Sequence, residues 1–310
     1  MTGDALEGLE SGWDDALVEL AGRDPGLRVV DAGPPGSLSR LAEKFPDRVV
    51  REPLDGPGAI ERAAGLARPG HCIYVRTDAL SAAGAAYLPI RRTLCAGRAN
   101  VKVVAVPSEG SAELPTMLED VAMMRGLPGM TVAVPADAPT ARSATLALAA
   151  FDGPAYLRLS SGPSPVVGDG RFELGRAPQL RAGSDLAVVA NGPMVARALG
   201  LSEELAKVGL HVRVLDFASM KPFDEKALLA AARETGAILT MEAQSVVGGL
   251  GALVAAVTAD SHPVPVRRLG VPDVFARPDA GPGGLDRYGL SAERAMEEAW
   301  ELLKLRGKVQ

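Results

Sequence analysis

The sequence predicts an α/β protein of two domains, each a mostly parallel sheet flanked by helices. Short Val-rich apolar runs alternate with Ala- and Leu-rich segments of helical period, which is typical of buried parallel strands joined by helices. This alternation occurs in two series along the 310 residues. A stretch rich in glycine and proline, residues 160–184, separates the series and breaks both periods. We therefore predict one domain over residues 1–175 and a second, smaller one over residues 176–310.

The first series opens with a predicted helix over Leu6–Ala21 and a buried strand over Leu27–Asp31. The other strands predicted from short apolar runs are residues 48–50, 72–76, 101–106, 131–134 and 155–159. The helices predicted between them are residues 59–67, 82–94, 117–124 and 138–150.

The second series repeats the pattern. Its predicted strands are residues 185–191, 211–217, 237–242 and 264–270. Its predicted helices are residues 194–208, 225–234, 251–259 and 291–305. GGLG at 248–251 follows a strand and opens a helix, so it is either a tight turn with close packing or a site where backbone amides meet an anion. MKPFD at 220–224 is interpreted as a loop that ends in a helix N-cap.

Composition and charge exclude several classes of protein. The chain is 47% hydrophobic, and Lys plus Arg number 33 against 38 for Asp plus Glu, so a nucleic-acid partner is not expected. Apolar stretches such as Ala144–Phe151 are far shorter than the ~20 residues of a membrane span. The acidic start lacks the positive region of a signal peptide, so we expect a cytoplasmic protein without membrane contact.

Cysteine and histidine give no metal motif. Cys72 and Cys95 lie in apolar segments without a CxxC spacing, which predicts buried, reduced thiols. His71, His211 and His262 are too scattered for a local ligand motif, so no metal site is predicted in this chain.

Residues 183–251 and the VRRLGVPDVF that follows resemble the C-terminal domain of the transketolase family. The resemblance lies in GSDLAVVANG, LHVRVLDFASMKPFDEKAL and ARETGAILTMEAQSVVGGLG. The first half resembles the pyrimidine-binding domain of that family through VVDAGPPGS, AAGLA, ANVKVV, LEDVAMMRGLPGMTVAVPADA and DGPAYLRL. Together these segments cover nearly the whole chain.

The resemblance implies a small subunit of a split enzyme. In the family, a further N-terminal domain holds the diphosphate of thiamine diphosphate and its Mg²⁺. The resemblance therefore implies that a separate chain holds most of this cofactor, that the two chains form a heterotetramer, and that the substrate is a small molecule. The sequence agrees in part, because it has no GxGxxG or GxxxxGK[ST] phosphate cradle and no carboxylate set typical of a diphosphate and Mg²⁺ site.

The acid that activates the cofactor in this family is missing at its expected position. Family members carry a glutamate in GIAEQN, just ahead of the helix that ends in AAGLA. Counting back without gaps from Ala63 places this glutamate at Gly56, which cannot exchange a proton. Loss of a positioned acid or base costs about 10²–10⁴ in rate. Asp55 is the nearest candidate for the role, with Glu52 and Glu61 as alternatives, although DGPG is also a strong turn sequence.

Other positions of the family's site also differ. The aromatic segment that stacks on the pyrimidine corresponds to residues 77–85, which contain no ring, so Asp78 and Ser81 become the candidate cofactor contacts. The loop that supplies a substrate histidine corresponds to residues 107–116, where Glu109 is the candidate substrate contact. A sugar-phosphate arginine is replaced by Ser161. Arg158 remains, either as an anion contact or in a salt bridge at the surface or facing another subunit.

These observations support two main functions. In the first, the chain is a working subunit of a transketolase-like transferase complex that makes or transfers C–C bonds with an atypical substrate lacking a phosphate. In the second, it is a non-catalytic subunit that serves assembly or regulation of such a complex. A third alternative is that the α/β scaffold binds an unrelated small molecule.

Overall fold

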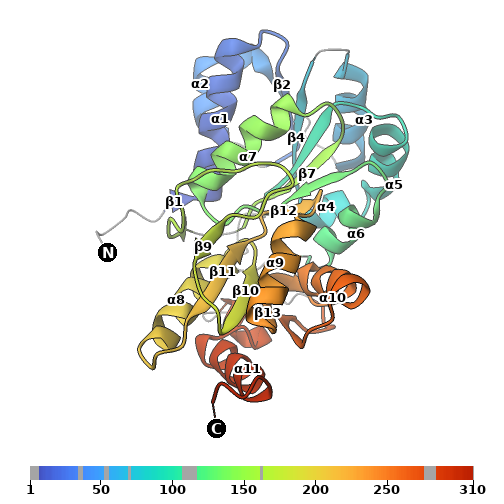
Figure 1. Ribbon diagram of the computed structural model, residues 1–310. Coiled ribbons are helices and arrows are strands. Elements are labelled where there is room, and N and C mark those ends of the chain that lie inside the picture. The colour runs from blue at the N-terminus through green and yellow to red at the C-terminus, as the bar shows by residue number, and fades with distance from the viewer. Residues whose placement is uncertain are drawn as a thin grey trace.

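The computed structural model describes residues 7–33, 38–51, 56–68, 71–106, 117–160, 163–275 and 284–309. Two sheets dominate these residues, one of seven strands and one of five, and a third, two-stranded sheet pairs β1 (Glu7–Gly8) with β8 (Pro163–Ser164). Figure 1 shows the first large sheet in the upper half of the molecule and the second in the lower half. The predicted fold class is confirmed.

The seven-stranded sheet has the order β12-β6-β7-β5-β4-β2-β3. Its strands are β2 (Arg28–Asp31), β3 (Val49–Arg51), β4 (Ile73–Asp78), β5 (Val101–Val106), β6 (Thr131–Ala133), β7 (Ala155–Arg158) and β12 (Ser219–Lys221). All neighbouring pairs are parallel except β12 with β6. Because the strands are parallel, the carboxyl ends of β4, β5 and β7 lie at one edge of the sheet.

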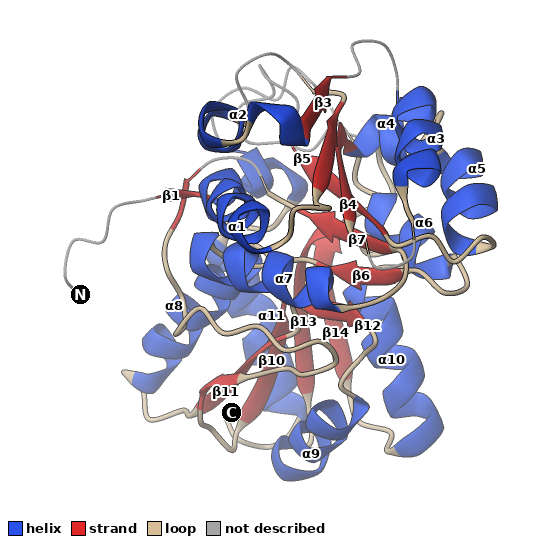
Figure 2. Cartoon of the chain, turned by 90° about the horizontal axis from the view of Figure 1, so that it is seen from above, coloured by secondary structure: helices blue, strands red, loops and turns tan. Residues whose placement is uncertain are grey.

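Helices cover both faces of this sheet (Figure 2). The helices that pack on one face are α1 (Leu9–Arg23), α2 (Ser39–Lys44) and α7 (Ala138–Ala150). The other face carries α3 (Gly56–Leu66), α4 (Ala79–Ala83), α5 (Tyr87–Pro89), a π-helical segment (Ile90–Cys95) and α6 (Asp120–Gly126). Burial on both faces explains why β5, VKVVAV, is buried at every position.

The five-stranded sheet has the order β14-β13-β10-β11-β9. Its strands are β9 (Gln179–Arg181), β10 (Leu186–Ala190), β11 (Val212–Asp216), β13 (Ile238–Ser245) and β14 (Val266–Val271), and only β9 is antiparallel to its neighbour. Helices α8 (Met194–Ala206) and α11 (Ala292–Leu305) pack on one face. Helices α9 (Glu225–Thr235) and α10 (Leu250–Ser261) pack on the other, toward the first sheet.

One hydrophobic core extends through both halves of the chain. It joins side chains under α3 and α6, such as Ile60 and Val121, to side chains of the second sheet and its helices, such as Val189, Leu228 and Val254. Strand β12 strengthens this connection, because it follows β11 in sequence but pairs with β6 of the first sheet. The predicted division near residue 175 stays a prediction.

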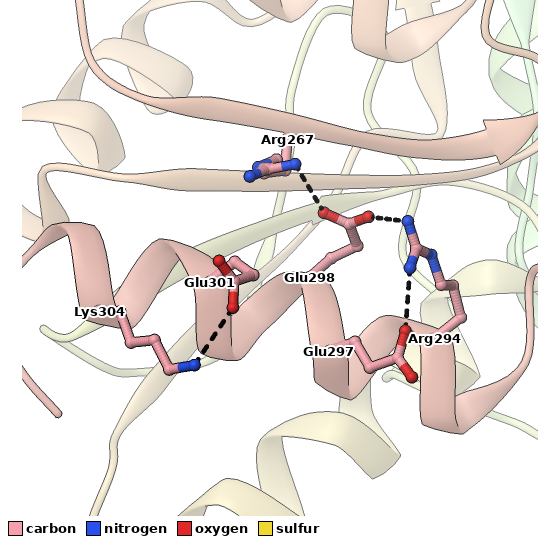
Figure 3. A network of polar contacts seen from close by, with 6 residues as sticks. All are labelled: Arg267, Arg294, Glu297, Glu298, Glu301 and Lys304. Carbon is pink, nitrogen blue, oxygen red and sulfur yellow. Dashed lines mark hydrogen bonds and ion pairs between the residues drawn. The ribbon is translucent and has the colours of Figure 1, made fainter. Parts of the chain in front are cut away.

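Helix α11 is attached to the second sheet by apolar contacts and by a surface network of ion pairs. Figure 3 shows Glu298 between Arg267 of β14 and Arg294 of α11. Glu298 Oε2 lies 3.4 Å from Arg267 Nη1, and Arg294 also pairs with Glu297 at 2.9 Å. Such partly exposed pairs contribute below about 1 kcal/mol each, so buried leucines such as Leu302 supply most of the attachment.

Several predicted elements differ from the structure. The single helix predicted over residues 82–94 is wrong, because α4 ends at Ala83 and separate short helical segments follow. The segment interpreted as a loop, MKPFD, contributes to β12, although its Asp224 caps α9 as predicted by accepting a hydrogen bond from the Ala227 amide at 3.0 Å. Gly56 lies in the first turn of α3, so this helix starts three residues before the predicted Ala59.

Cys72 and Cys95 are both buried and free, as predicted. Burial raises the pKa of the Cys72 thiol to about 11, which keeps this sulfur protonated and unreactive. In the described part of the chain, no helix has the length and apolar character needed to cross a membrane.

Candidate functional site

The carboxyl edge of the first sheet brings together the sequence-predicted residues that the structure describes. Asp78, the last residue of β4, pairs in register with Val106 of β5, and Ala105 pairs with Arg158 of β7. Ser81 lies in α4, directly after β4. Asp55, Glu52, Glu109 and Ser161 lie outside the described residues.

Gly56 is buried at the start of α3 and packs closely against the α4 region. A Cβ atom added to it would lie 2.9 Å from Ser81 Cβ, 3.3 Å from Ala86 Cβ and 3.4 Å from the Ser81 carbonyl oxygen. The position predicted for the family's glutamate therefore lacks an acid and also lacks room for a side chain. Glu61, an alternative acid on the same helix, is exposed to solvent.

This close packing predicts the effect of a Gly56→Ala substitution. The added methyl group must displace Ser81, and overpacking of this kind lowers the free energy of unfolding by about 1–3 kcal/mol. Gly65→Ala is the matched control in the same helix, because nothing lies within 4 Å of an added Cβ there. We expect the control to gain up to about 1 kcal/mol, the helix propensity of alanine over glycine. Chemical denaturation measures both; equal changes in the two variants would contradict the close contact at Gly56.

Asp78 and Ser81 bind each other. Asp78 caps α4: its Oδ1 accepts a hydrogen bond from the Ser81 amide at 2.9 Å, and its Oδ2 accepts one from the Ser81 hydroxyl at 2.7 Å. This arrangement is a helix N-cap with both carboxylate oxygens used. A cofactor contact by either side chain stays a prediction, and it would require these hydrogen bonds to be shared or broken.

Arg158 forms a buried ion pair inside the chain. Its Nε lies 2.8 Å from Asp120 Oδ2, and its Nη1 donates a hydrogen bond to the Leu159 carbonyl at 2.6 Å. Asp120 Oδ2 also accepts a hydrogen bond from the Tyr156 hydroxyl at 2.6 Å. All three side chains are buried. The salt bridge that the sequence suggested exists, but it is internal rather than at the surface, and an anion contact by Arg158 stays a prediction.

The described residues at this edge do not fit the family's way of activating an aminopyrimidine ring. Position 56 offers neither a carboxylate nor space for one, and residues 77–85 contain no aromatic side chain. In the segments that the structure describes, no three His, Cys, Asp or Glu side chains gather closely enough to hold a metal ion.

The GGLG segment is a turn whose amides bind an internal carboxylate. Glu242, on β13 and fully buried, accepts hydrogen bonds from the amides of Leu250 at 2.7 Å and Gly251 at 2.8 Å. A Cβ on Gly249 would collide with this carboxylate, which explains the glycine there. The side chain of Glu242 occupies the helix N-terminus where the sequence suggested an external anion, so the turn interpretation is correct.

The burial of Glu242 predicts a pH dependence. Burial raises the pKa of this carboxyl from 4.5 to about 7, although the two amides and the nearby Arg125 and Arg268 act against the rise. The folded chain therefore binds more protons than the unfolded chain between pH 4.5 and 7, and the free energy of unfolding falls as pH rises through that window.

In a Glu242→Gln variant, the part of the fall in the free energy of unfolding that Glu242 causes should disappear. This part has a slope of up to about 1.4 kcal/mol per pH unit. Burial and the nearby Asp137 also raise the pKa of Asp216 to about 7, so wild type and variant share that contribution. The free energy of unfolding of wild type and variant is therefore measured by denaturation at about pH 5 and at about pH 7.5, which together span most of the window. The difference between the two proteins at each pH isolates Glu242. Parallel pH profiles would show that Glu242 titrates normally.

A cleft that sequence reasoning missed opens where the two halves meet. Its volume is about 400 Å³, and its lining residues are Glu119, Ser245, Val247, Asp273, Val274 and Phe275. They come from the segment before α6 and from the carboxyl ends of β13 and β14. The amide of Ser245 donates a hydrogen bond to the Leu118 carbonyl at 2.9 Å, which ties the two halves together at the cleft. Its lining residues come from three stretches of the sequence, at 119, 245–247 and 273–275, which only the fold brings together.

Comparison with known proteins gives a consistent result over the whole chain. Residues 175–294 match the family model "Transketolase, C-terminal domain". The 6-deoxy-6-sulfo-D-fructose transketolase subunit SqwH of Clostridium sp. (strain MSTE9) is 35% identical over 95% of this chain and 94% of its own length. An apulose-4-phosphate transketolase subunit of Phocaeicola vulgatus is 34% identical over 94% of this chain and 96% of its own length.

A solved structure described as a split gene transketolase, inactive beta4 tetramer, is similar in both fold and sequence. It superposes with a TM-score of 0.89 at 38% identity and covers 97% of this chain and 99% of its own. The similarity thus includes both sheets and the connection between them.

Proposed function

Because this chain belongs to the transketolase family, as the C-terminal half of a split transketolase, we propose that it is the small subunit of a two-chain, transketolase-like transferase. The complex would make or transfer C–C bonds and would contain a separate chain equivalent to the family's N-terminal half. One observation carries this proposal. Two relatives that are themselves named as subunits match this chain, and the match covers at least 94% of the length of each relative.

We further propose that the partner chain holds most of the thiamine diphosphate and its Mg²⁺ in a heterotetramer. Thiamine diphosphate supplies the carbanion-stabilising chemistry of the family. The role of this chain would be to cover the cofactor with the carboxyl edge of its first sheet, and Asp55 remains the candidate for the acid that Gly56 cannot provide.

A small-molecule substrate without a phosphate group fits the residues at this edge. Ser161 stands where family members carry a sugar-phosphate arginine, and Arg158 is already paired with Asp120. The names of the relatives indicate different substrates, a sulfonated deoxy sugar for one and a sugar phosphate for the other. Substrate choice therefore varies among similar chains.

The test is to co-purify this chain with its partner and titrate the pair with thiamine diphosphate. We expect saturable binding and turnover by the pair, and neither by this chain alone. The absence of saturable binding by the assembled pair would exclude the proposal.

A second candidate function, a non-catalytic subunit for assembly or regulation, is favoured by the packing at Gly56. Ser81 and Ala86 pack against the position predicted for the family's acid, and Asp78 is used as a helix cap. Turnover measured with the partner alone and with both chains separates the two functions. Full turnover by the partner alone would support the non-catalytic subunit, and turnover that requires both chains would support the working subunit.

A further inference from the structure

The cleft between the halves carries an unusual group of exposed apolar side chains. Phe275 is 85% exposed, Val247 59% and Val274 48%, and all three line this cleft. Exposed apolar side chains gathered at one place mark interaction sites more often than scattered ones do.

We propose that this cleft is the docking surface for the N-terminal-half subunit, and that it receives an apolar side chain of that subunit flanked by Lys or Arg. This inference rests on the proposed function, and it names the surface and the chemistry of the partner.

The shape of the site favours a protein over a small molecule. A small ligand is recognised by a concave pocket that buries most of it, with few side chains projecting away. Phe275 is instead mostly exposed, and a protein surface can cover such a side chain more fully than a small ligand in the cleft can. Buried aromatic anchors of this kind dominate the energy of protein interfaces.

The charge of the lining defines the partner's chemistry. Among the residues that the structure describes, Glu119 and Asp273 are the charged ones that line the cleft, and no lysine or arginine does. Neither carboxylate forms an ion pair with any residue in the described part of the chain. These two carboxylates beside three apolar groups are complementary to a basic segment with an apolar side chain, and such complementarity guides association and fixes the choice of partner.

The position of the cleft fits an interface that continues to the candidate functional site. Glu119 lies just before α6, and α6 packs against α4, which carries Ser81. A partner that covers the carboxyl edge of the first sheet can therefore reach the cleft along α6. The hydrogen bond between Ser245 and Leu118 keeps the two sides of the cleft in register.

The experiment measures the affinity of this full chain for the separately expressed N-terminal-half subunit by calorimetry at low and high salt. The variants are Phe275→Ser and Asp273→Lys. Their matched controls are Leu305→Ser, at an apolar residue 65% exposed on α11, and Asp260→Lys, at an exposed carboxylate at the far end of α10. Thermal unfolding checks that each variant is folded.

We expect Phe275→Ser to weaken binding about tenfold or more and Asp273→Lys to weaken it and reduce its salt dependence, while both controls bind like wild type. Wild-type affinity in both cleft variants would overturn this inference and leave the proposed function intact. No binding by the wild-type chain would overturn both. Sedimentation of each variant alone measures its self-association. If Phe275→Ser abolishes self-association but leaves partner binding unchanged, a second copy of this chain occupies the cleft and the inference is wrong.

Discussion

Replacing Asp120 by alanine should lower the free energy of unfolding by about 3–5 kcal/mol, because it breaks a buried ion pair. Asp120 is fully buried and binds both the Arg158 guanidinium and the Tyr156 hydroxyl. Removing it leaves a buried cation without a counterion, and breaking a buried pair by removing one partner is strongly destabilising for this reason. Urea denaturation monitored by circular dichroism measures the change.

Two further variants test the cause of this loss. Asp120→Ala combined with Arg158→Met removes both charges, so we expect it to recover part of the stability. Glu19→Ala removes the partner of Arg23 and Arg142 at the surface and should cost below about 1 kcal/mol. If Asp120→Ala lowers the free energy of unfolding no more than Glu19→Ala does, the buried ion pair does not stabilise the fold as proposed.

The second large effect is expected from Lys102→Met. The Lys102 side chain is fully buried, and its Nζ donates hydrogen bonds to Asn100 Oδ1 at 2.7 Å and to the carbonyls of Phe151 at 2.7 Å and Gly153 at 2.5 Å. Burial lowers the pKa of this ammonium to about 8, so it is still mainly protonated at pH 7.

Methionine keeps much of the shape of Lys102 but leaves three oxygens without their donor, of which the buried Gly153 carbonyl alone costs about 1–3 kcal/mol. We expect a loss of about 2–3 kcal/mol in the free energy of unfolding, measured by denaturation at neutral pH. Lys207→Met is the control at an exposed lysine paired with Glu204, and it should change stability by less than about 0.5 kcal/mol. A loss of similar size in both variants would show that the three oxygens find water instead.

Most of the fold was predictable because the strands of a parallel sheet are continuous apolar runs. Strand β5 and helix α7 have the predicted bounds, 101–106 and 138–150. Two of the missed elements, β9 and β12, are three residues long and antiparallel to strands distant in sequence. The single helix predicted over residues 82–94 overlooked two local signals, Gly84 directly after α4 and Pro89 inside the predicted span.

The sequence could name candidate residues for the site, whose role stays a prediction, but most of their contacts could not be predicted. Motif spacing predicts the missing acid at Gly56, which stays a prediction, and the structure adds that Ser81 and Ala86 pack against this position. The pairing of Asp78 with Ser81 is local. An aspartate at a helix N-cap, three residues before its hydrogen-bond partner, is a pattern that the sequence contains. The partner of Arg158, Asp120, lies far away in sequence and could not be identified from a single chain.

Strand β12 gives the chain a property of its own. It belongs by sequence to the second half, yet it covers the outer margin of β6 in the first sheet. A fragment truncated before β9 would lack β12 and would expose the edge of β6. An exposed strand edge can pair with another molecule. We therefore expect such a fragment to polymerise or precipitate. In the full chain, the second half prevents this association because its β12 stays paired with β6.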